Sequence, residues 1–438
     1  MTNKTTSFFA IVTGSPTGAG VMSSAVASHF PPSRTMGAAE AHAAVNAETG
    51  NLCFSAKSMQ VTDLGVKWPL GFVYNSHAKT PWQLQGFDSV GPASNSSVQF
   101  TRADGALINY QYDATRKAYV HFDPEQGLQL LTQQADRTWV HTTPLTGVQK
   151  LYDISGRLTA RIDKNGNQTI VTYEGNTLIT LPSGQTITYE KTASSYNIYL
   201  GGTTTKPVQS ANFDAQGRLT DQSWFCAEDE SSYFVNYDYD AKTNFLESAT
   251  QADQTSLQFA YDANLRVSTV QDGEGRVETL AYADGTCTVT NGLKQTTQYA
   301  VSNQQLTAVT LPNGEATNFA YDASTGLVDT VTLPNKAAQT YGYDANGLVI
   351  SANHQDAGNT IQQPVKYLRD ADGRVLNRIT FVNISDQQAV IYEHRFIYDA
   401  NGNALFDIEN EAITQHDYDA QGNRVASRRY VGLNGELP

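Results

Sequence analysis

The stretch Tyr152–Leu158 reads YDISGRL, and variants of it recur through the chain. Further copies are FDAQGRL (Phe213–Leu219), YDANGLV (Tyr343–Val349), YDANGNAL (Tyr398–Leu405) and YDAQGNRV (Tyr418–Val425), and an aromatic residue also precedes Asp at Tyr112, Tyr239, Tyr261 and Tyr321. From Tyr239 to Tyr343 the aromatic positions are separated by 22, 21, 17, 22 and 22 residues. A period of about 21 residues indicates an array of one repeated structural unit.

Each part of the repeat has a physical role. The Asp side chain accepts hydrogen bonds from backbone amides and so begins a turn, and Gly supplies the positive φ that completes it. Before the turn, aromatic residues recur two positions apart, as at Phe259 and Tyr261, which places both rings on one face of a strand. After the turn, alternation such as Leu158 and Ala160 predicts the returning strand. A second turn, as in LPNG at Leu311, closes the unit, so each repeat is predicted to be a β-hairpin.

The number of repeats predicts the fold class. About thirteen hairpins would form a sheet of roughly 25 to 30 strands, whereas open twisted sheets seldom exceed ~10 strands without coiling or closing. The sequence therefore predicts an all-β fold, a long antiparallel sheet of hairpins coiled into a curved ribbon or partial hollow shell. The strand number excludes a narrow barrel. We expect a flexible Ser/Gly/Pro-rich lead-in at 1–40, lead-in strands at 41–97 and the repeat shell at 98–438.

The YDxxGRL hairpin at this period resembles the RHS repeat, also called the YD repeat, of bacterial polymorphic toxins, insecticidal toxin complexes and teneurins. The resemblance covers about residues 98–430. Upstream, the segments Ala41–Val61, Trp68–His77 and Pro81–Leu84 look like the strands that open the shell in that family, with a TGNL turn and a YNS strand. The resemblance implies a β-cocoon whose repeats spiral around a cytotoxic polypeptide.

Two parts of the family pattern have no counterpart in the sequence. Such shells carry a core region with a DPxG-type stretch and aspartates that release the toxin, followed by the toxin itself. The DP pair of this chain, Asp123-Pro124 in FDPEQG, has a different spacing and lies near the opposite end. We therefore assign no cleavage residue, and we expect either a truncated or split shell piece or a shell whose remaining half is supplied by another chain.

Composition and charge exclude several classes of protein. The 29 basic and 43 acidic residues leave a net charge of −14, which disfavours nucleic acid because binding phosphates requires a basic surface. The three cysteines, Cys53, Cys226 and Cys287, contain no close pair, so neither a disulfide framework nor a zinc ribbon is predicted. The apolar run Phe8–Val12 is too short for a membrane span of about 20 residues. Because the glycines from Gly14 onward interrupt it, we expect a secreted or cell-surface protein without a classical signal peptide.

Residues that could carry chemistry are explained more simply by structure. The eight histidines are scattered, and we expect His416 to pack on a strand face. Asp163, Asn165, Asn167 and Glu174 approach a calcium-loop pattern, but the mid-loop Gly is displaced and the flanks are strands. The remaining candidates are the glycine run Thr13–Val21, which lacks the Lys of a phosphate-binding loop, the solvated acidic run Glu228–Glu230, and the cysteines, which we expect to pack as small hydrophobes. We predict no catalytic, cofactor-binding or metal-binding residue, no cofactor and no enzymatic activity.

The rows of tyrosine and phenylalanine rings leave two functions open. Rings packed across neighbouring strands stabilise a sheet by about 0.2 to 1 kcal/mol per pair, and they suit a non-catalytic shell that encapsulates or helps deliver a toxic polypeptide. Rings exposed in clusters would instead suit a surface adhesin that binds carbohydrate or a receptor. The shell predicts inward-facing rings, a toxin cargo or complementary shell chain as partner, and association through sheet edges, which are templates for pairing.

Overall fold

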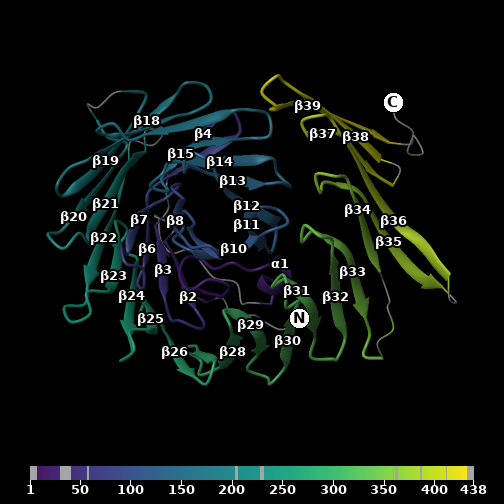
Figure 1. Ribbon diagram of the computed structural model, residues 1–438. Coiled ribbons are helices and arrows are strands. Elements are labelled where there is room, and N and C mark those ends of the chain that lie inside the picture. Colours follow the sequence, from purple (N-terminus) through teal and green to yellow (C-terminus); the bar gives the residue numbers. More distant parts are fainter. Residues whose placement is uncertain are drawn as a thin grey trace. The chain divides into compact units, whose positions relative to one another are not determined.

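The computed structural model describes residues 7–29, 41–56, 59–202, 206–226, 231–358, 360, 364–384, 387–410 and 412–431. Within these ranges the chain forms one short helix, α1 (Ser24–Ala27), and otherwise strands joined by turns (Figure 1). The prediction of an all-β fold is therefore confirmed. Alternation of apolar and polar side chains, as in β24 (Ser256–Tyr261), gives these segments one buried and one exposed face, which is the pattern of an antiparallel strand.

The N-terminal strands form two small sheets. The first is five-stranded, in the order β1-β2-β3-β6-β7, and the second is the hairpin β4-β5. The strands are β1 (Ala10–Val12), β2 (His42–Asn46), β3 (Leu52–Ser55), β4 (Met59–Asp63), β5 (Val66–Leu70), β6 (Phe72–Asn75) and β7 (Trp82–Leu84). The TGNL sequence turns the chain from β2 into β3, where the Asn46 side chain accepts the backbone N–H groups of Glu48 and Thr49. The YNS sequence ends β6, which pairs with β3.

The rest of the described chain forms one long antiparallel sheet of 32 strands in sequence order. Its first half comprises β8 (Ser89–Ala93), β9 (Ser97–Thr101), β10 (Leu107–Asp113), β11 (Ala118–Asp123), β12 (Gly127–Gln133), β13 (Trp139–Thr143), β14 (Val148–Tyr152), β15 (Leu158–Ile162), β16 (Gln168–Thr172), β17 (Thr177–Thr180), β18 (Thr186–Lys191), β19 (Ser195–Leu200), β20 (Gln209–Phe213), β21 (Leu219–Cys226), β22 (Ser231–Tyr239) and β23 (Leu246–Gln251). Its second half comprises β24, β25 (Val267–Asp272), β26 (Val277–Ala283), β27 (Thr286–Thr290), β28 (Thr296–Ser302), β29 (Gln305–Thr310), β30 (Ala316–Tyr321), β31 (Val328–Thr332), β32 (Ala338–Tyr343), β33 (Val349–Gln355), β34 (Val365–Arg369), β35 (Val375–Ile384), β36 (Gln387–Tyr398), β37 (Ala404–Glu409), β38 (Ala412–Tyr418) and β39 (Arg424–Val431). The repeat predicted from the sequence is thus a hairpin.

A β-bulge accompanies the aromatic–Asp step of the repeat. The register shifts immediately before Tyr261, where Ala260 pairs with Thr269 but Tyr261 pairs with Val267. The same shift occurs before Phe213, Tyr239, Tyr321, Tyr343, Tyr398 and Tyr418. A bulge inserts one unpaired residue, bends its strand and increases the local twist. The sequence motif therefore sets the twist of the sheet at regular intervals.

The contacts divide the chain into two compact units. Unit 1 comprises Met1–Asn109, Tyr152–Thr159 and Thr169–Ala316, and unit 2 comprises Tyr110–Leu151, Ala160–Gln168 and Thr317–Pro438. In unit 1 the small sheets pack against the face of the long sheet that carries the repeat tyrosines, which we call the ring face. Figure 1 shows β2, β3, β6 and β7 beside β22–β25 in this unit.

Unit 2 joins hairpins that are far apart in the sequence. The turn after β15 lies against the turns that precede β37 and β39: Lys164 Nζ donates to the Gly402 carbonyl at 2.7 Å, and Asn167 Nδ2 donates to the Gln421 carbonyl at 2.8 Å. Nearer the start of this unit, the Leu128 N–H donates to the Asn346 carbonyl at 2.7 Å. The repeat turns therefore serve a second purpose, because their carbonyl groups accept hydrogen bonds from early hairpins.

The described part of the 1–40 segment is folded into unit 1. Phe8 and Phe9 are 7% and 2% exposed, and β1 pairs in parallel with β2. The Gly14 N–H donates to the Gln304 carbonyl at 2.6 Å, and the Gly18 N–H donates to Asn75 Oδ1 at 2.7 Å. The glycines that suggest flexibility in the sequence thus permit close approach of two backbones. The expected boundaries at residues 40 and 97 stay predictions.

Candidate functional site: the ring face and its clamps

The Asp of the repeat organises its turn through both carboxylate oxygens. Asp262 Oδ1 accepts the backbone N–H groups of Asn264 and Arg266, each at 2.9 Å, and its Oδ2 accepts Arg266 Nε at 2.8 Å. The same Asp-to-Arg contact occurs at Asp153–Arg157, Asp214–Arg218, Asp272–Arg276 and Asp370–Arg374, and an Asn replaces the Arg at Asp163–Asn167, Asp399–Asn403 and Asp419–Asn423. The fourth residue after the Asp is therefore tied to it by its side chain.

The tied arginine reaches a ring of the next repeat. The guanidinium carbon of Arg266 lies 4.5 Å from the ring centroid of Tyr282, a cation–π contact. Equivalent contacts join Arg157 to Tyr173, Arg218 to Tyr239 and Arg374 to Tyr398. The contact with the Asp therefore fixes the guanidinium group beside the ring.

The same ring closes the link with its hydroxyl group. Tyr282 Oη donates to the carbonyl of Val267, the residue that follows Arg266, at 2.9 Å. The corresponding pairs are Tyr173 to Leu158, Tyr239 to Leu219, Tyr261 to Leu246, Tyr343 to Val328, Tyr398 to Val375 and Tyr418 to Ala404. We call the contact of a repeat tyrosine with the carbonyl of the preceding repeat, with its arginine where present, a clamp. Each clamp joins two successive hairpins.

The roles of the Asp, the Gly and the ring spacing can be predicted from the sequence, but the clamp was not predicted. The signal for it is present in the sequence, because Arg or Asn occupies the fourth position after the Asp in most copies. Finding it requires knowing that this arginine faces the next repeat. Phe213 occupies the tyrosine position of its repeat without a hydroxyl group, and the ring instead packs edge-on against Phe72 at 5.6 Å.

Removal of one clamp hydroxyl is expected to weaken the sheet measurably. In Tyr282→Phe the ring stays but the hydrogen bond to the Val267 carbonyl is lost, so the free energy of unfolding should fall by about 1 kcal/mol. Tyr112→Phe is the control, because Tyr112 is 45% exposed and its change should stay within about 0.5 kcal/mol. Urea unfolding followed by tyrosine fluorescence measures both. Equal effects of the two substitutions would contradict a structural role for the clamp hydroxyl.

The turn carboxylates make stability depend on pH. The pKa of Asp322 is lowered from 3.8 to about 2, first by the Ser324 hydroxyl and then by the Thr325 hydroxyl and N–H, which donate to the ionised form. A pKa that is lower in the folded than in the unfolded state stabilises the fold above pH 4, and this contribution is lost as the pH falls from about 4 to about 2. The urea midpoint should therefore drop over this window. Asp322→Asn should show a shallower drop, and an unchanged slope would refute the assignment.

In unit 1 the ring face is covered. Phe54 of β3 packs edge-on against Tyr237 at 6.1 Å and Phe259 at 5.9 Å. Trp68 of β5 donates its indole N–H to Tyr189 Oη at 3.1 Å, and Trp82 of β7 donates to Tyr239 Oη at 2.7 Å. Burial raises the pKa of Tyr189, Tyr237 and Tyr239 above the ordinary tyrosine value. The rings of this unit therefore form a core, as the packing interpretation predicts.

In unit 2 the ring face of β34–β38 is only half-buried and carries charge. Tyr367, Tyr392, Phe396 and Tyr398 are each of intermediate exposure. In the register of this face, Arg378 lies opposite His394. The corresponding positions of β22–β25 hold uncharged side chains such as Val235, Leu257 and Val270, which are 0%, 1% and 0% exposed. The two parts of the ring face thus differ in chemistry.

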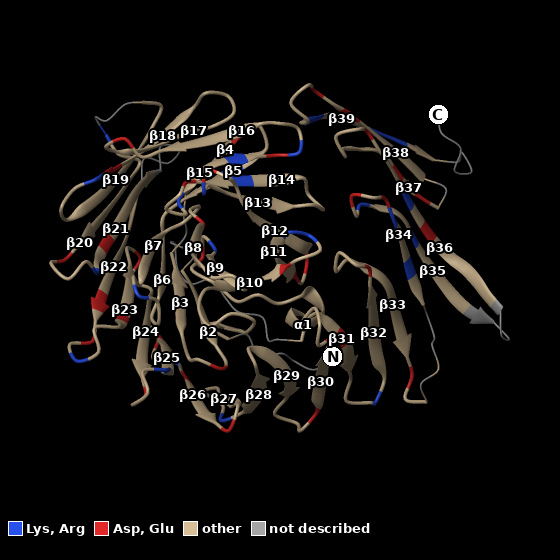
Figure 2. Cartoon of the chain, viewed as in Figure 1, with Lys and Arg blue, Asp and Glu red and all other residues tan. Residues whose placement is uncertain are grey.

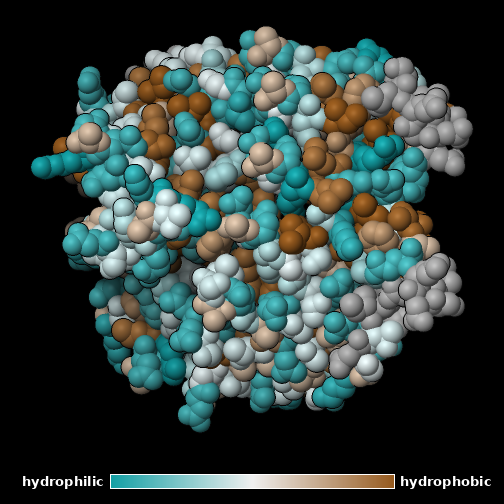
Figure 3. Space-filling model, turned by 45° about the vertical axis from the view of Figure 1, so that its right-hand side comes forward, coloured by the Kyte–Doolittle hydropathy of each residue, from teal (hydrophilic) through white to brown (hydrophobic). Residues whose placement is uncertain are grey.

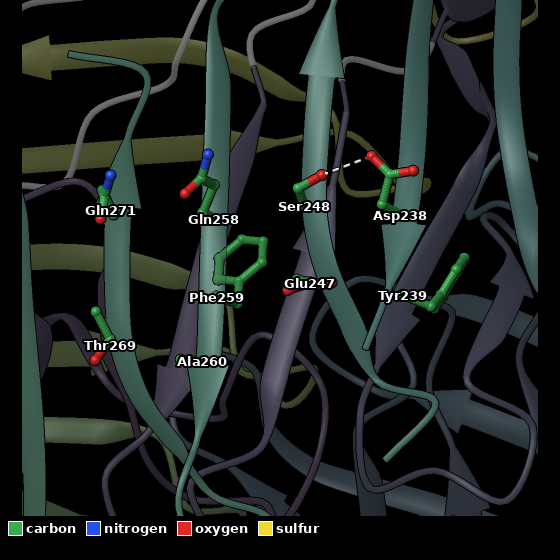
Figure 4. A pocket seen from close by; sticks show the side chains of 9 residues that line it. All are labelled: Asp238, Tyr239, Glu247, Ser248, Gln258, Phe259, Ala260, Thr269 and Gln271. Atoms are coloured by element: carbon green, nitrogen blue, oxygen red, sulfur yellow. Dashed lines mark hydrogen bonds between the residues drawn. The ribbon is translucent and has the colours of Figure 1, made fainter. Parts of the chain in front are cut away.

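A hollow lies over β22–β25 (Figure 4). Its volume is about 620 Å³, and its lining consists of Asp238, Tyr239, Glu247, Ser248, Gln258, Phe259, Ala260, Thr269 and Gln271. Ser248 Oγ donates to Asp238 Oδ2 at 2.9 Å, and Figure 4 shows Gln258 and Gln271 on the two strands beyond Ser248. The lining can hydrogen-bond a polar molecule. Phe259 is only 4% exposed, so its ring offers no platform on which a sugar could stack.

The residues considered as chemical candidates from the sequence lie in separate places. Cys53 and Cys287 are buried free thiols, and burial raises the pKa of Cys287 to about 12, so neither is a ready nucleophile. His416 lies on a strand and hydrogen-bonds Ser427 Oγ at 2.8 Å. Asp163 accepts hydrogen bonds from the turn residues Asn165 and Asn167. The acidic run 228–230 and the side chain of Cys226 lie outside the described residues.

Among the described residues, no group of three or more His, Cys, Asp or Glu side chains is placed to hold a metal ion. Within the same part of the chain, no helix has the length and apolar character needed to cross a membrane. The candidate functional site is therefore the ring face, which carries the repeated contacts between successive hairpins.

Comparisons with known proteins were made for the whole chain. No protein-family model matches it. No curated protein matches it either. Similar solved structures include TcdB2-TccC3-TEV (13% identity, 87% of this chain, 23% of that chain, TM-score 0.42), TcdB2-TccC3 (15%, 90%, 22%, 0.29) and the Photorhabdus luminescens Tc holotoxin pore (15%, 88%, 20%, 0.28).

The chain spans between 20% and 23% of the length of these solved chains. Its resemblance to the RHS, or YD, repeat family stands on the repeated motif and its hairpins.

Proposed function

We propose that this chain is a non-catalytic shell protein of RHS type that encloses, or helps to deliver, a toxic polypeptide. The observation that carries the proposal is the clamp, which recurs from Tyr173 to Tyr418 and ties successive hairpins into one continuous sheet. A sheet held in this way offers a wide, continuous surface. Such a surface suits the holding of a polypeptide better than the chemistry of a small substrate.

The proposal includes partners and a place of action. The partners are a toxin cargo or a complementary shell chain. A second copy of this chain, joined through the sheet edges, is a third kind of protein partner. The protein acts outside the cell that makes it, as a secreted or cell-surface component. No cofactor is needed, because holding a polypeptide requires only surface contacts.

An adhesin that binds carbohydrate is the alternative. It requires rings that are exposed in clusters, since sugars stack on open aromatic faces. Tyr237 and Phe259 are both 4% exposed. The buried rings of unit 1 therefore favour the shell.

Protection of a held polypeptide from protease tests the shell. The purified full chain is mixed with a reduced, carboxymethylated reporter protein that cannot fold, and proteinase K is added. We expect the reporter to co-elute with the chain in size-exclusion chromatography and to be digested at least about tenfold more slowly than the free reporter. An unrelated β-sheet protein of similar size is the control. Digestion at the free rate would refute the proposal.

A further inference from the structure

The C-terminal hairpins of unit 2 differ from the other repeats in both of their faces. On the ring face, Tyr392, His394 and Phe396 alternate along β36 and are all half-buried. On the opposite face, Leu368 and Val390 are each 56% exposed. Figure 3 shows hydrophobic side chains interspersed among hydrophilic ones on the visible surface. A sheet usually buries at least one face to be stable. On the ring face, these hairpins therefore have surface that a partner can cover.

The strand register places three arginines on the ring face of these hairpins. Arg378 pairs with His394, Arg429 pairs with Thr414, and Arg424 pairs with Tyr418. Directly paired residues share a face, and so do residues two or four apart on one strand. At the usual strand spacing, the width from β35 to β39 is roughly 19 Å. Figure 2 shows the basic residues of these strands.

The carboxylates of the same face already have partners. Asp407 accepts His394 Nε2 at 2.5 Å, and Glu409 accepts the Tyr392 hydroxyl at 2.8 Å. The guanidinium carbon of Arg378 lies 5.3 Å from the centroid of the Tyr392 ring, a cation–π contact. Among the described residues, no carboxylate forms an ion pair with Arg378, Arg424 or Arg429. With Arg378, Arg424 and Arg429 against the two carboxylates Asp407 and Glu409, these positions of the face carry a net positive charge.

We propose that the ring face of β34–β39 binds an acidic segment of the held polypeptide, through Arg378, Arg424 and Arg429 and the rings of Tyr392 and Phe396. The inference rests on the proposed shell function and adds the chemistry of the cargo. Guanidinium groups recognise carboxylates through paired hydrogen bonds, and neighbouring rings bind the apolar part of the same segment. The chain as a whole carries a net charge of −14, so an acidic segment is attracted to this face and repelled elsewhere.

Two variants separate the ring face from the opposite face of the same strands. The test variant is Arg378→Gln with Arg429→Gln. The control variant is Arg395→Gln with Arg428→Gln, because Arg395 pairs with Asn377 and Arg428 pairs with Gln415 on the opposite face. Both variants remove two positive charges from exposed or half-exposed positions. Circular dichroism and thermal unfolding verify that both stay folded.

The probes are two short fluorescein-labelled peptides, one of alternating Glu and Leu and one with Gln in place of each Glu. Fluorescence anisotropy with the full chain measures their dissociation constants. We expect the acidic peptide to bind more tightly, and added salt to weaken it. The test variant should weaken acidic binding by about tenfold, while the control variant leaves it nearly unchanged.

Other outcomes overturn the inference in distinguishable ways. Equal binding of both peptides, with no effect of the test variant, refutes recognition of acidic segments but leaves a shell that holds polypeptide. Binding of neither peptide also refutes it, and the protease experiment above then decides on the shell by itself. A dimer in light scattering that the test variant converts to monomer would assign this face to a second copy of the chain instead.

Discussion

Replacing Gly156 by alanine is expected to destabilise unit 1 more than the same change at any equivalent turn without a close neighbour. Gly156 has φ +77°, and a Cβ there would lie 1.9 Å from the Val90 carbonyl oxygen. The backbones also meet through the Val90 N–H, which donates to the Gly156 carbonyl at 2.9 Å. Strain together with loss of this hydrogen bond should lower the free energy of unfolding by about 3 kcal/mol. Urea unfolding measures the change.

The matched control lies in the next full copy of the motif. Gly217 occupies the same turn position with φ +78°, but a Cβ there would meet nothing within 4 Å. Gly217→Ala should therefore cost only the backbone strain of a left-handed residue, about 1 kcal/mol. If both substitutions cost the same, the contact between Gly156 and Val90 does not contribute to stability.

Truncation of Trp68 should have the largest effect of any side chain in the contact between the small sheets and the ring face. Trp68 is 2% exposed, donates to Tyr189 Oη at 3.1 Å and packs edge-on against Phe87 at 5.4 Å. Trp68→Ala leaves a cavity and an unpaired buried hydroxyl, so the free energy of unfolding should fall by about 3–5 kcal/mol. Differential scanning calorimetry would record a lower melting temperature.

Two control variants show whether the loss comes from the buried ring and its hydrogen bond. Trp68→Phe keeps an aromatic ring but loses the indole N–H, so it should recover more than half of the stability. Leu293→Ala removes a large apolar side chain that is 74% exposed, and its effect should stay within about 0.5 kcal/mol. A small loss for Trp68→Ala would mean that the small sheets contribute little to the stability of the ring face.

The hairpin and its turn could be predicted because their causes are local. Asp262 and the backbone amides that it accepts lie within four residues of each other, and the alternation of Leu257 and Phe259 marks one strand face. Local chemistry of this kind is readable from sequence. The clamp could not be derived in the same way, because it depends on which ring of the next repeat the Arg266 side chain reaches.

The folding of the N-terminal segment was also not predicted from the sequence. Its serines and glycines are typical of a flexible lead-in, yet Ser15 Oγ donates to the Leu107 carbonyl at 3.1 Å and Asn46 Nδ2 donates to the Ser15 carbonyl at 2.6 Å. These partners are 92 and 31 residues away in the sequence. Composition alone cannot reveal contacts of such separation. The difference between the covered and the charged part of the ring face could not be predicted either, because it too depends on contacts between residues far apart in the sequence.

The clamp has a direction, and the direction has a mechanical consequence. The tyrosine always belongs to the later repeat and the carbonyl to the earlier one, as for Tyr282 and Val267. During synthesis, the carbonyl of a repeat can therefore accept its clamp hydrogen bond only after the tyrosine of the next repeat has been made. Force applied to the C-terminal end would release one clamp before the next comes under load, so the array should peel in steps of one repeat. The same force applied at the N-terminal end would first meet the small sheets that cover the ring face of unit 1.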